Sequence, residues 1–130
     1  MSGARPLPGG KLEYAVLVAV WNRGEATSRE LHDEVGVPLD LVYTTTARVL
    51  DRLHAKGLIT RERHGKTFLY RATVARPDID RAHMSKTLAG IFRDEPRPAL
   101  AHLVEAIESI DPALLDDLAL VVDLRRRSRR

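Results

Sequence analysis

Cysteine is absent from the 130 residues of this chain. Disulfide bonds, thiolate chemistry and cysteine metal sites are therefore excluded, and we expect a cytoplasmic protein. No run of about 18 apolar residues occurs, so we expect no segment to span a membrane. Residues 1–10 lack an apolar stretch behind a basic region, and we therefore expect no secretory signal there.

Motifs typical of enzymes are also missing. The sequence has no GxGxxG or GxxxxGK[ST] phosphate loop and no GxSxG nucleophile motif. No two histidines have the spacing of three or four that zinc sites favour. His54 and His64 belong to a basic surface, and we expect the other three at the surface or at an interface (His32, His83 and His102). We therefore predict no enzyme, no metal and no cofactor.

Charge is distributed unevenly along the chain, although the net charge is only +3. Between Leu41 and Arg71, seven basic residues oppose two acidic ones, a net charge of +5. Between Asp78 and Leu124, four basic residues oppose ten acidic ones, a net charge of −6. A basic segment beside an acidic one indicates a polyanion-binding module joined to a part that avoids the polyanion.

The first half of the chain has the pattern of a helix-turn-helix. Residues 11–22 have helical apolar spacing. Thr27-Ser28-Arg29-Glu30 is a capping box that starts a second helix, and Gly36-Val37-Pro38 closes that helix. Asp40 is expected to cap a third helix. A helix, a tight turn and a helix with a polar outer face follow the order of DNA-binding helix-turn-helix motifs.

The third helix, predicted at residues 41–57, has two chemically different faces. Its apolar stripe consists of Val42, Val49, Leu50 and Leu53. Its opposite face consists of Thr44, Thr45, Arg48, Arg52 and Lys56. Short hydroxyl side chains for base edges, with arginines for bases or phosphates, are typical of a helix that enters the major groove of DNA. An ordinary solvated face is the alternative.

A β-hairpin is predicted after this helix. Residues 58–63 and 66–71 alternate in the manner of strands around a turn at His64-Gly65. Phe68 and Tyr70 share one face, which we expect to pack on the helices. The tip is basic (Arg63, His64 and Lys66), which predicts a wing that lies along the phosphate backbone or in the minor groove. A solvated hairpin is the alternative.

Three amphipathic helices are predicted beyond residue 76. Asp78 is expected to cap the first, which runs to about Arg93, and Pro96 and Pro98 break it. Asp111-Pro112 begins the last helix. About 50 residues in three helices bury little apolar surface alone, so a partner surface is needed, and an identical subunit is the simplest one. We therefore predict a dimerisation region.

The predicted fold is mainly α-helical with a small β-hairpin wing. We divide it into a flexible N-terminus (1–10), a winged helix-turn-helix DNA-binding domain (11–75), a helical dimerisation domain (76–124) and a basic tail (125–130).

Several of these motifs resemble the BlaI/MecI/CopY family of penicillinase-repressor-like regulators. Leu12-Glu13 followed by Val16-Leu17 and Val20-Trp21 is similar to the opening of that family. Tyr43-Thr44-Thr45, Val49-Leu50, Arg52-Leu53 and Lys56-Gly57-Leu58 resemble its recognition helix, and Gly65, Phe68 and Tyr70 its wing. The resemblance covers residues 12–72 by motif.

The resemblance implies a homodimeric repressor of dyad operators, often of the TACA/TGTA kind, that controls β-lactam-response or related genes. It implies double-stranded DNA as partner and, in some members, a regulatory protease that releases the repressor. The Asn-Phe dipeptide cut in some relatives has no counterpart, since the nearest pair is Ile91-Phe92. The copper-responsive branch is excluded because its metal ligands are cysteines.

Residue by residue, Thr45, Arg52 and Lys56 match a threonine, an arginine and a lysine common in the family's recognition helix. Two positions depart from the pattern. Thr46 stands where valine or isoleucine is usual, which makes one core position more polar. Arg48 stands where threonine is common, and arginine can contact guanine O6 and N7 together.

The leading hypothesis is a repressor in which Thr44, Thr45 and Arg48 lie nearest the bases. The remaining basic residues would hold phosphates (Arg52, Lys56, Arg63, His64 and Lys66). A winged-helix protein-interaction module and a small-molecule-responsive regulator are the alternatives.

Overall fold

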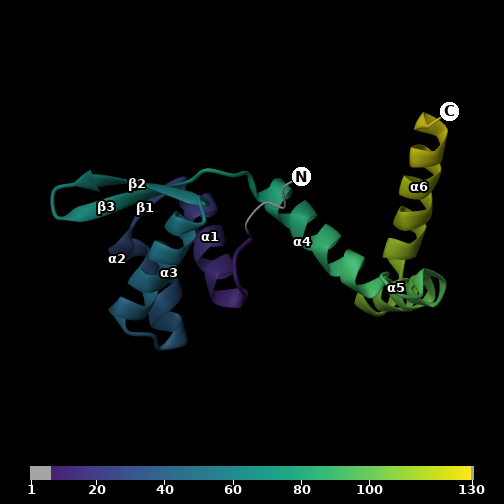
Figure 1. Ribbon diagram of the computed structural model, residues 1–130, viewed down its shortest axis with the longest axis horizontal. Helices are drawn as coiled ribbons and strands as arrows, with labels where there is room; N and C mark the ends of the chain where they lie inside the picture. The colour runs from purple at the N-terminus through teal and green to yellow at the C-terminus, as the bar shows by residue number, and fades with distance from the viewer. Residues whose placement is uncertain (1–6, 130) are drawn as a thin grey trace. The chain divides into compact units, whose positions relative to one another are not determined.

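The computed structural model describes residues 7–129, which form a mainly helical protein with one small antiparallel sheet (Figure 1), as predicted. The chain divides into two compact units between Met84 and Ser85. The helices and strands are α1 (Lys11–Arg23), β1 (Glu25–Thr27), α2 (Ser28–Leu31), the π-helical turn η1 (His32–Gly36), the 3-10 turn η2 (Val37–Leu39), α3 (Tyr43–Ala55), β2 (Ile59–His64), β3 (Thr67–Ala72), α4 (Arg76–Ile91), α5 (Pro96–Ile110) and α6 (Ala113–Ser128).

The predicted hairpin is present, with its turn one residue later than expected. β2 and β3 are antiparallel, and His64 pairs with Thr67, so Gly65 and Lys66 form a two-residue connection. Gly65 has a φ of 63°, which suits glycine at the first turn position. The hairpin reaches past the helices of its unit (Figure 1). β1 was not predicted; its three residues are too few to show alternation, and it pairs with the other side of β3.

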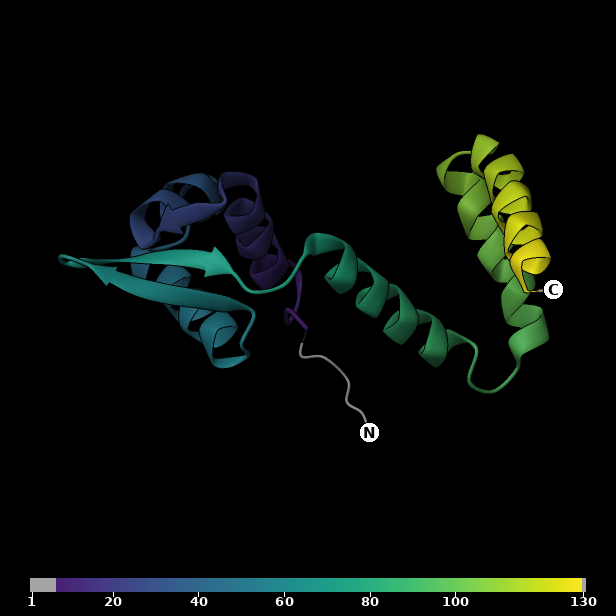
Figure 2. The same cartoon turned by 90° about the horizontal axis from the view of Figure 1, so that it is seen from above.

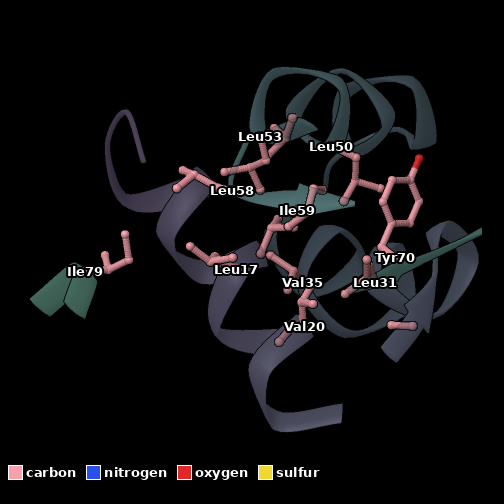
Figure 3. Packing of buried hydrophobic residues seen from close by; sticks show 14 residues of the cluster. Leu17, Val20, Leu31, Val35, Leu50, Leu53, Leu58, Ile59, Tyr70 and Ile79 are labelled. Carbon is pink, nitrogen blue, oxygen red and sulfur yellow. The ribbon is translucent and has the colours of Figure 1, made fainter. Parts of the chain in front are cut away.

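The core of the first unit is built from α1, α2, α3 and the sheet, with Val35 of η1 and Ile79 of α4 (Figure 3). The predicted stripe residues Val49, Leu50 and Leu53 are fully buried. The prediction for Val42 was wrong, because its side chain is 66% exposed. Since α3 begins at Tyr43, Val42 precedes the first turn, and Thr46 occupies the fourth position of the buried stripe.

Helix capping was predicted correctly at Thr27 and wrongly at Asp40, Asp78 and Asp111. The Glu30 amide donates to Thr27 Oγ1 (3.1 Å) and the Thr27 amide to Glu30 Oε1 (2.9 Å), which confirms the capping box. Asp40 does not cap α3, because it ends η2 in a left-handed conformation (φ 59°), two residues before the cap at Val42. Asp78 does not cap α4, which already begins at Arg76. The N-cap of α6 is Pro112 rather than Asp111, although Asp111 Oδ1 accepts from the Ala113 amide (3.0 Å).

A buried polar pair joins the second helical segment to α3. The Nδ1 atom of His32 lies 2.8 Å from Oγ1 of Thr46, and both residues are buried. The expectation that His32 lies at the surface was therefore wrong; its ring faces inward, where Thr46 satisfies it. Gly36 packs directly on this pair, since a Cβ there would lie 2.3 Å from His32 Nδ1 and 2.5 Å from Thr46 Oγ1.

The second unit buries little of its apolar surface. α5 and α6 pack against each other (Figure 2), but Ala99 is the only buried hydrophobic residue of Ser85–Arg129. α6 continues to Ser128, so Arg125–Arg127 lie in its last turn rather than in a separate tail. The exposed apolar side chains of the two helices are Leu100, Val104, Ile110, Leu114, Leu120, Val121, Val122 and Leu124.

Gly36→Ala should lower the free energy of unfolding by about 1–3 kcal/mol, because the added methyl overlaps the His32–Thr46 pair. Urea unfolding followed by fluorescence of Trp21, the single tryptophan, measures this in the first unit. Gly90→Ala is the control, since its Cβ would meet no atom within 4 Å. Equal midpoints for the two variants would contradict close packing at Gly36.

Candidate nucleic-acid interface

The outer face of α3 begins at a turn held by Tyr43. The Tyr43 hydroxyl lies 2.7 Å from Ser28 Oγ, and its ring packs edge-on against His32 at 5.4 Å. The Arg29 guanidinium lies 5.0 Å from the same ring, in a cation–π contact. These contacts fix the start of α3 against α2 and the π-helical turn. Thr44 is consequently exposed and Thr45 half-buried.

An exposed apolar edge lies before the first turn of α3. Val37 and Leu39 are each 56% exposed, and Val42 is more so. The only apolar group that a base presents in the major groove is the thymine methyl. Val42 therefore offers an exposed apolar group next to Thr44, although the sequence pattern placed it in the core.

Two predicted phosphate-binding residues, Arg52 and Lys56, meet at one buried carboxylate. Glu13 of α1 has a side chain only 7% exposed. Its Oε1 accepts from Lys56 Nζ (2.7 Å) and from the Gly9 amide (2.8 Å), and its Oε2 accepts from Arg52 Nε (3.1 Å). Sequence reasoning missed Glu13, although a glutamate within an apolar helical pattern is a signal for a buried ion pair.

The surroundings of Glu13 change its ionisation. Burial by itself would raise the pKa of this carboxyl group. The hydrogen bonds from Lys56, from the Gly9 amide and from Arg52 outweigh burial and lower the pKa to about 2. Glu13 is therefore a permanent anion at neutral pH, and it balances part of the positive charge of α3.

The same cluster orders part of the predicted flexible N-terminus. Lys56 Nζ donates to the Leu7 carbonyl (3.0 Å), Pro8 is buried, and the Gly9 amide is bound to Glu13. Residues 7–10 of the predicted N-terminal segment therefore lie against the folded unit. Residues 1–6 of that prediction lie outside the described residues.

The wing presents its basic residues at the turn. Arg63 lies 5.5 Å from the Phe68 ring, with Arg61 on the same ring at 4.6 Å. His64 contacts Glu62 at 3.0 Å, which lowers the pKa of that carboxyl group. Lys66 occupies the turn itself and is exposed. Phe68 and Tyr70 pack toward the core, as predicted.

Pairing with acids separates the cations of the basic segment into two groups. Arg61 pairs with Asp51 (3.0 Å) and Arg71 with Glu25 (2.6 Å), in addition to the pairs at Glu13. Within residues 7–129, no acidic side chain forms an ion pair with Arg48, Arg63 or Lys66. The cations left for an external anion therefore lie on the exposed face of α3 and at the tip of the wing.

Between residues 7 and 129, no three His, Cys, Asp or Glu side chains gather in a way that could hold a metal ion. None of the helices described there is long and apolar enough to cross a membrane.

A helix-turn-helix followed by a two-stranded wing defines the class of winged-helix DNA-binding proteins. The family model described as "Penicillinase repressor" matches residues 9–123. The chain belongs to this penicillinase repressor family, and it is a transcriptional regulator of that type. Members are repressors rather than enzymes, which confirms the prediction that this chain is not an enzyme.

The relatives agree with this assignment. The transcriptional regulator BlaI of Mycobacterium tuberculosis (strain ATCC 25618 / H37Rv) is 34% identical over 100 residues, which span 75% of this chain and 72% of the relative. The solution structure of the DNA-binding domain of the repressor BlaI has a TM-score of 0.51 at 21% identity, covering 57% of this chain and 92% of that domain.

A second solved structure shares the fold over a longer stretch. It is the PcaV transcriptional regulator of Streptomyces coelicolor with its natural ligand, at a TM-score of 0.50 and 21% identity, covering 85% of this chain and 80% of PcaV. At this level of identity, both solved structures support the winged-helix fold alone.

Glu13→Gln should lower the free energy of unfolding by about 2 kcal/mol at pH 7. The folded pKa of about 2 lies below the ordinary value of 4.5, so ionised Glu13 stabilises the fold fully above pH 4.5. That contribution is lost as the pH falls from 4.5 toward 2. The difference between wild type and variant, measured by urea unfolding, should therefore shrink in this range. A difference independent of pH would contradict the ion-pair cluster.

Proposed function

We propose that the chain is a homodimeric repressor that places one α3 in each of two successive major grooves of a dyad operator. The observation that carries this proposal is the location of the cations that pair with no acid of residues 7–129, which are Arg48 on the exposed face of α3 and Arg63 and Lys66 at the wing tip. A recognition helix in the major groove and a wing on the backbone would bring both groups to DNA at once.

Each predicted residue has a role in this proposal. Thr44, Thr45 and Arg48 lie nearest the bases, because they occupy the first turns of α3. The phosphates are contacted by Arg52 and by the wing residues Arg63, His64 and Lys66. Lys56 supports α3 from the fold side, since its ammonium group already donates to Glu13 and to the Leu7 carbonyl.

The second unit would supply the dimer contact. The exposed apolar side chains of α5 and α6 are too many for a stable isolated surface, and a second copy of the chain would cover them. Residues 78–124, which include α5 and most of α6, have a net charge of −6, and this fits a part that stays off the DNA. We infer that the target promoters belong to a β-lactam response or a related one, as the family name indicates.

Selection of bound sites from a random DNA pool tests this proposal directly. We expect two related half-sites whose centres lie about 34–36 Å apart, one turn of DNA. Sedimentation of the free protein should give the mass of two chains. Recovery of no preferred sequence, with retention of another protein instead, would favour a protein-interaction module.

Arg48→Ala should weaken binding to the selected operator by about 1–3 kcal/mol and binding to random DNA much less, if Arg48 reads a base. Fluorescence anisotropy titrations on both DNAs measure the two losses. Arg48→Lys is the matched variant, because it keeps the charge without the planar fork of guanidinium. Equal losses on operator and random DNA would make Arg48 a phosphate contact only.

Lys66→Ala should weaken binding to every sequence alike, because the wing contacts phosphates. The slope of log K against log salt should become less steep by about one for each bound protomer. Lys86→Ala is the control, an exposed lysine on α4. If the slope of the Lys66→Ala variant equals that of wild type, Lys66 at the wing tip does not contact phosphate.

A further inference from the structure

We propose that Glu13 is a positioning residue for DNA binding, whose carboxylate holds Lys56 within the fold and orients Arg52 toward the phosphate backbone. This inference rests on the proposed function. It adds that Lys56 stabilises the fold while Arg52 contacts phosphate. Arg52 lies in the last turn of α3, Lys56 caps the end of that helix four residues later, and both reach the same buried group on α1.

Lys56 and Arg52 differ in how many of their hydrogen-bond donors are used at and around the Glu13 carboxylate. Lys56 Nζ donates to Glu13 Oε1 at 2.7 Å and to the Leu7 carbonyl at 3.0 Å, and its side chain is 32% exposed. An ammonium group has three donors, so two of the three are already used inside the protein. Removing it to a phosphate would leave Glu13 and Leu7 without this donor.

Arg52 is held in another way. Only its Nε donates to Glu13, at 3.1 Å, and its side chain remains 54% exposed. The terminal nitrogens of the guanidinium have no hydrogen bond to any of residues 7–129 in the structure. Because the guanidinium is planar, fixing Nε also fixes the direction of the terminal nitrogens, which are the pair that binds phosphate with two parallel hydrogen bonds.

The carboxylate itself cannot leave this position easily. Glu13 is buried, its Oε1 also accepts from the Gly9 amide, and residues 7–10 lie beside it. An exposed carboxylate could move together with the Arg52 side chain and so compete with phosphate for its guanidinium. A buried one gives a fixed reference point on α1, against which the Arg52 side chain is set before DNA binds.

The salt dependence of operator binding tests this inference on the full-length protein. Arg52→Ala should make the slope of log K against log salt less steep by about 0.9 for each bound protomer, the value of one lost phosphate contact. Lys56→Met, which keeps the aliphatic stem, should leave the slope unchanged and lower the melting temperature. Glu13→Gln should weaken operator binding. Arg52→Ala should then cost less affinity in the Glu13→Gln background than it costs in the wild-type protein.

Three results would overturn the inference. They are a slope unchanged by Arg52→Ala, equal slope changes for Arg52→Ala and Lys56→Met, and additive effects of Glu13→Gln and Arg52→Ala. If Glu13→Gln fails to fold, by circular dichroism and Trp21 fluorescence, the comparison of Arg52→Ala with Lys56→Met decides alone. A slope that depends on Lys66 but not on Arg52 would overturn this inference only. Absence of operator binding by wild type would overturn the proposed function as well.

Discussion

Four side chains of α3 are buried in the first unit, and their burial fixes the rotation of the helix about its axis. Thr46, Val49, Leu50 and Leu53 follow the spacing of one helical face. Because the helix has 3.6 residues per turn, burying this stripe leaves Thr44, Arg48 and Arg52 on the exposed side. The chemistry offered to DNA is thus decided by the apolar contacts behind it. In the proposed complex the wing would add a second contact to DNA at the turn between β2 and β3, and the same core supports this hairpin through Tyr70.

Much of this arrangement could be predicted from the sequence, because it depends on local patterns. The capping box at Thr27 and the hairpin around Gly65 each arise from residues close together in the chain. Two of the failures, at His32 and Glu13, concern contacts between distant residues. His32 was expected at the surface or at an interface, and its partner Thr46, which holds it inside, is 14 residues away. Glu13 reaches cations 39 and 43 residues away, which no local spacing reveals.

The helix start shows a different cause of error. Val42 has the spacing of a core residue, but α3 begins one residue later, and periodicity has no meaning before the first turn. The candidate site shows a related weakness of charge counting. The basic segment has a net charge of +5, yet several of its cations are paired with Glu13, Glu25 or Asp51. The charge available to DNA depends on these pairs, and residues such as Glu13 lie outside the segment that was counted.

The buried pair of His32 and Thr46 restricts how this sequence can change over time. Every buried side-chain polar atom within residues 7–129 has a partner, and these two satisfy each other under Gly36. Replacing Thr46 alone by valine would strand the histidine, and replacing His32 alone would strand the hydroxyl. An apolar contact at this place therefore requires substitution of both residues together, and the close packing of Gly36 limits the size of both side chains. The three positions are therefore coupled through one contact, and an exchange at any of them changes what the other two can hold.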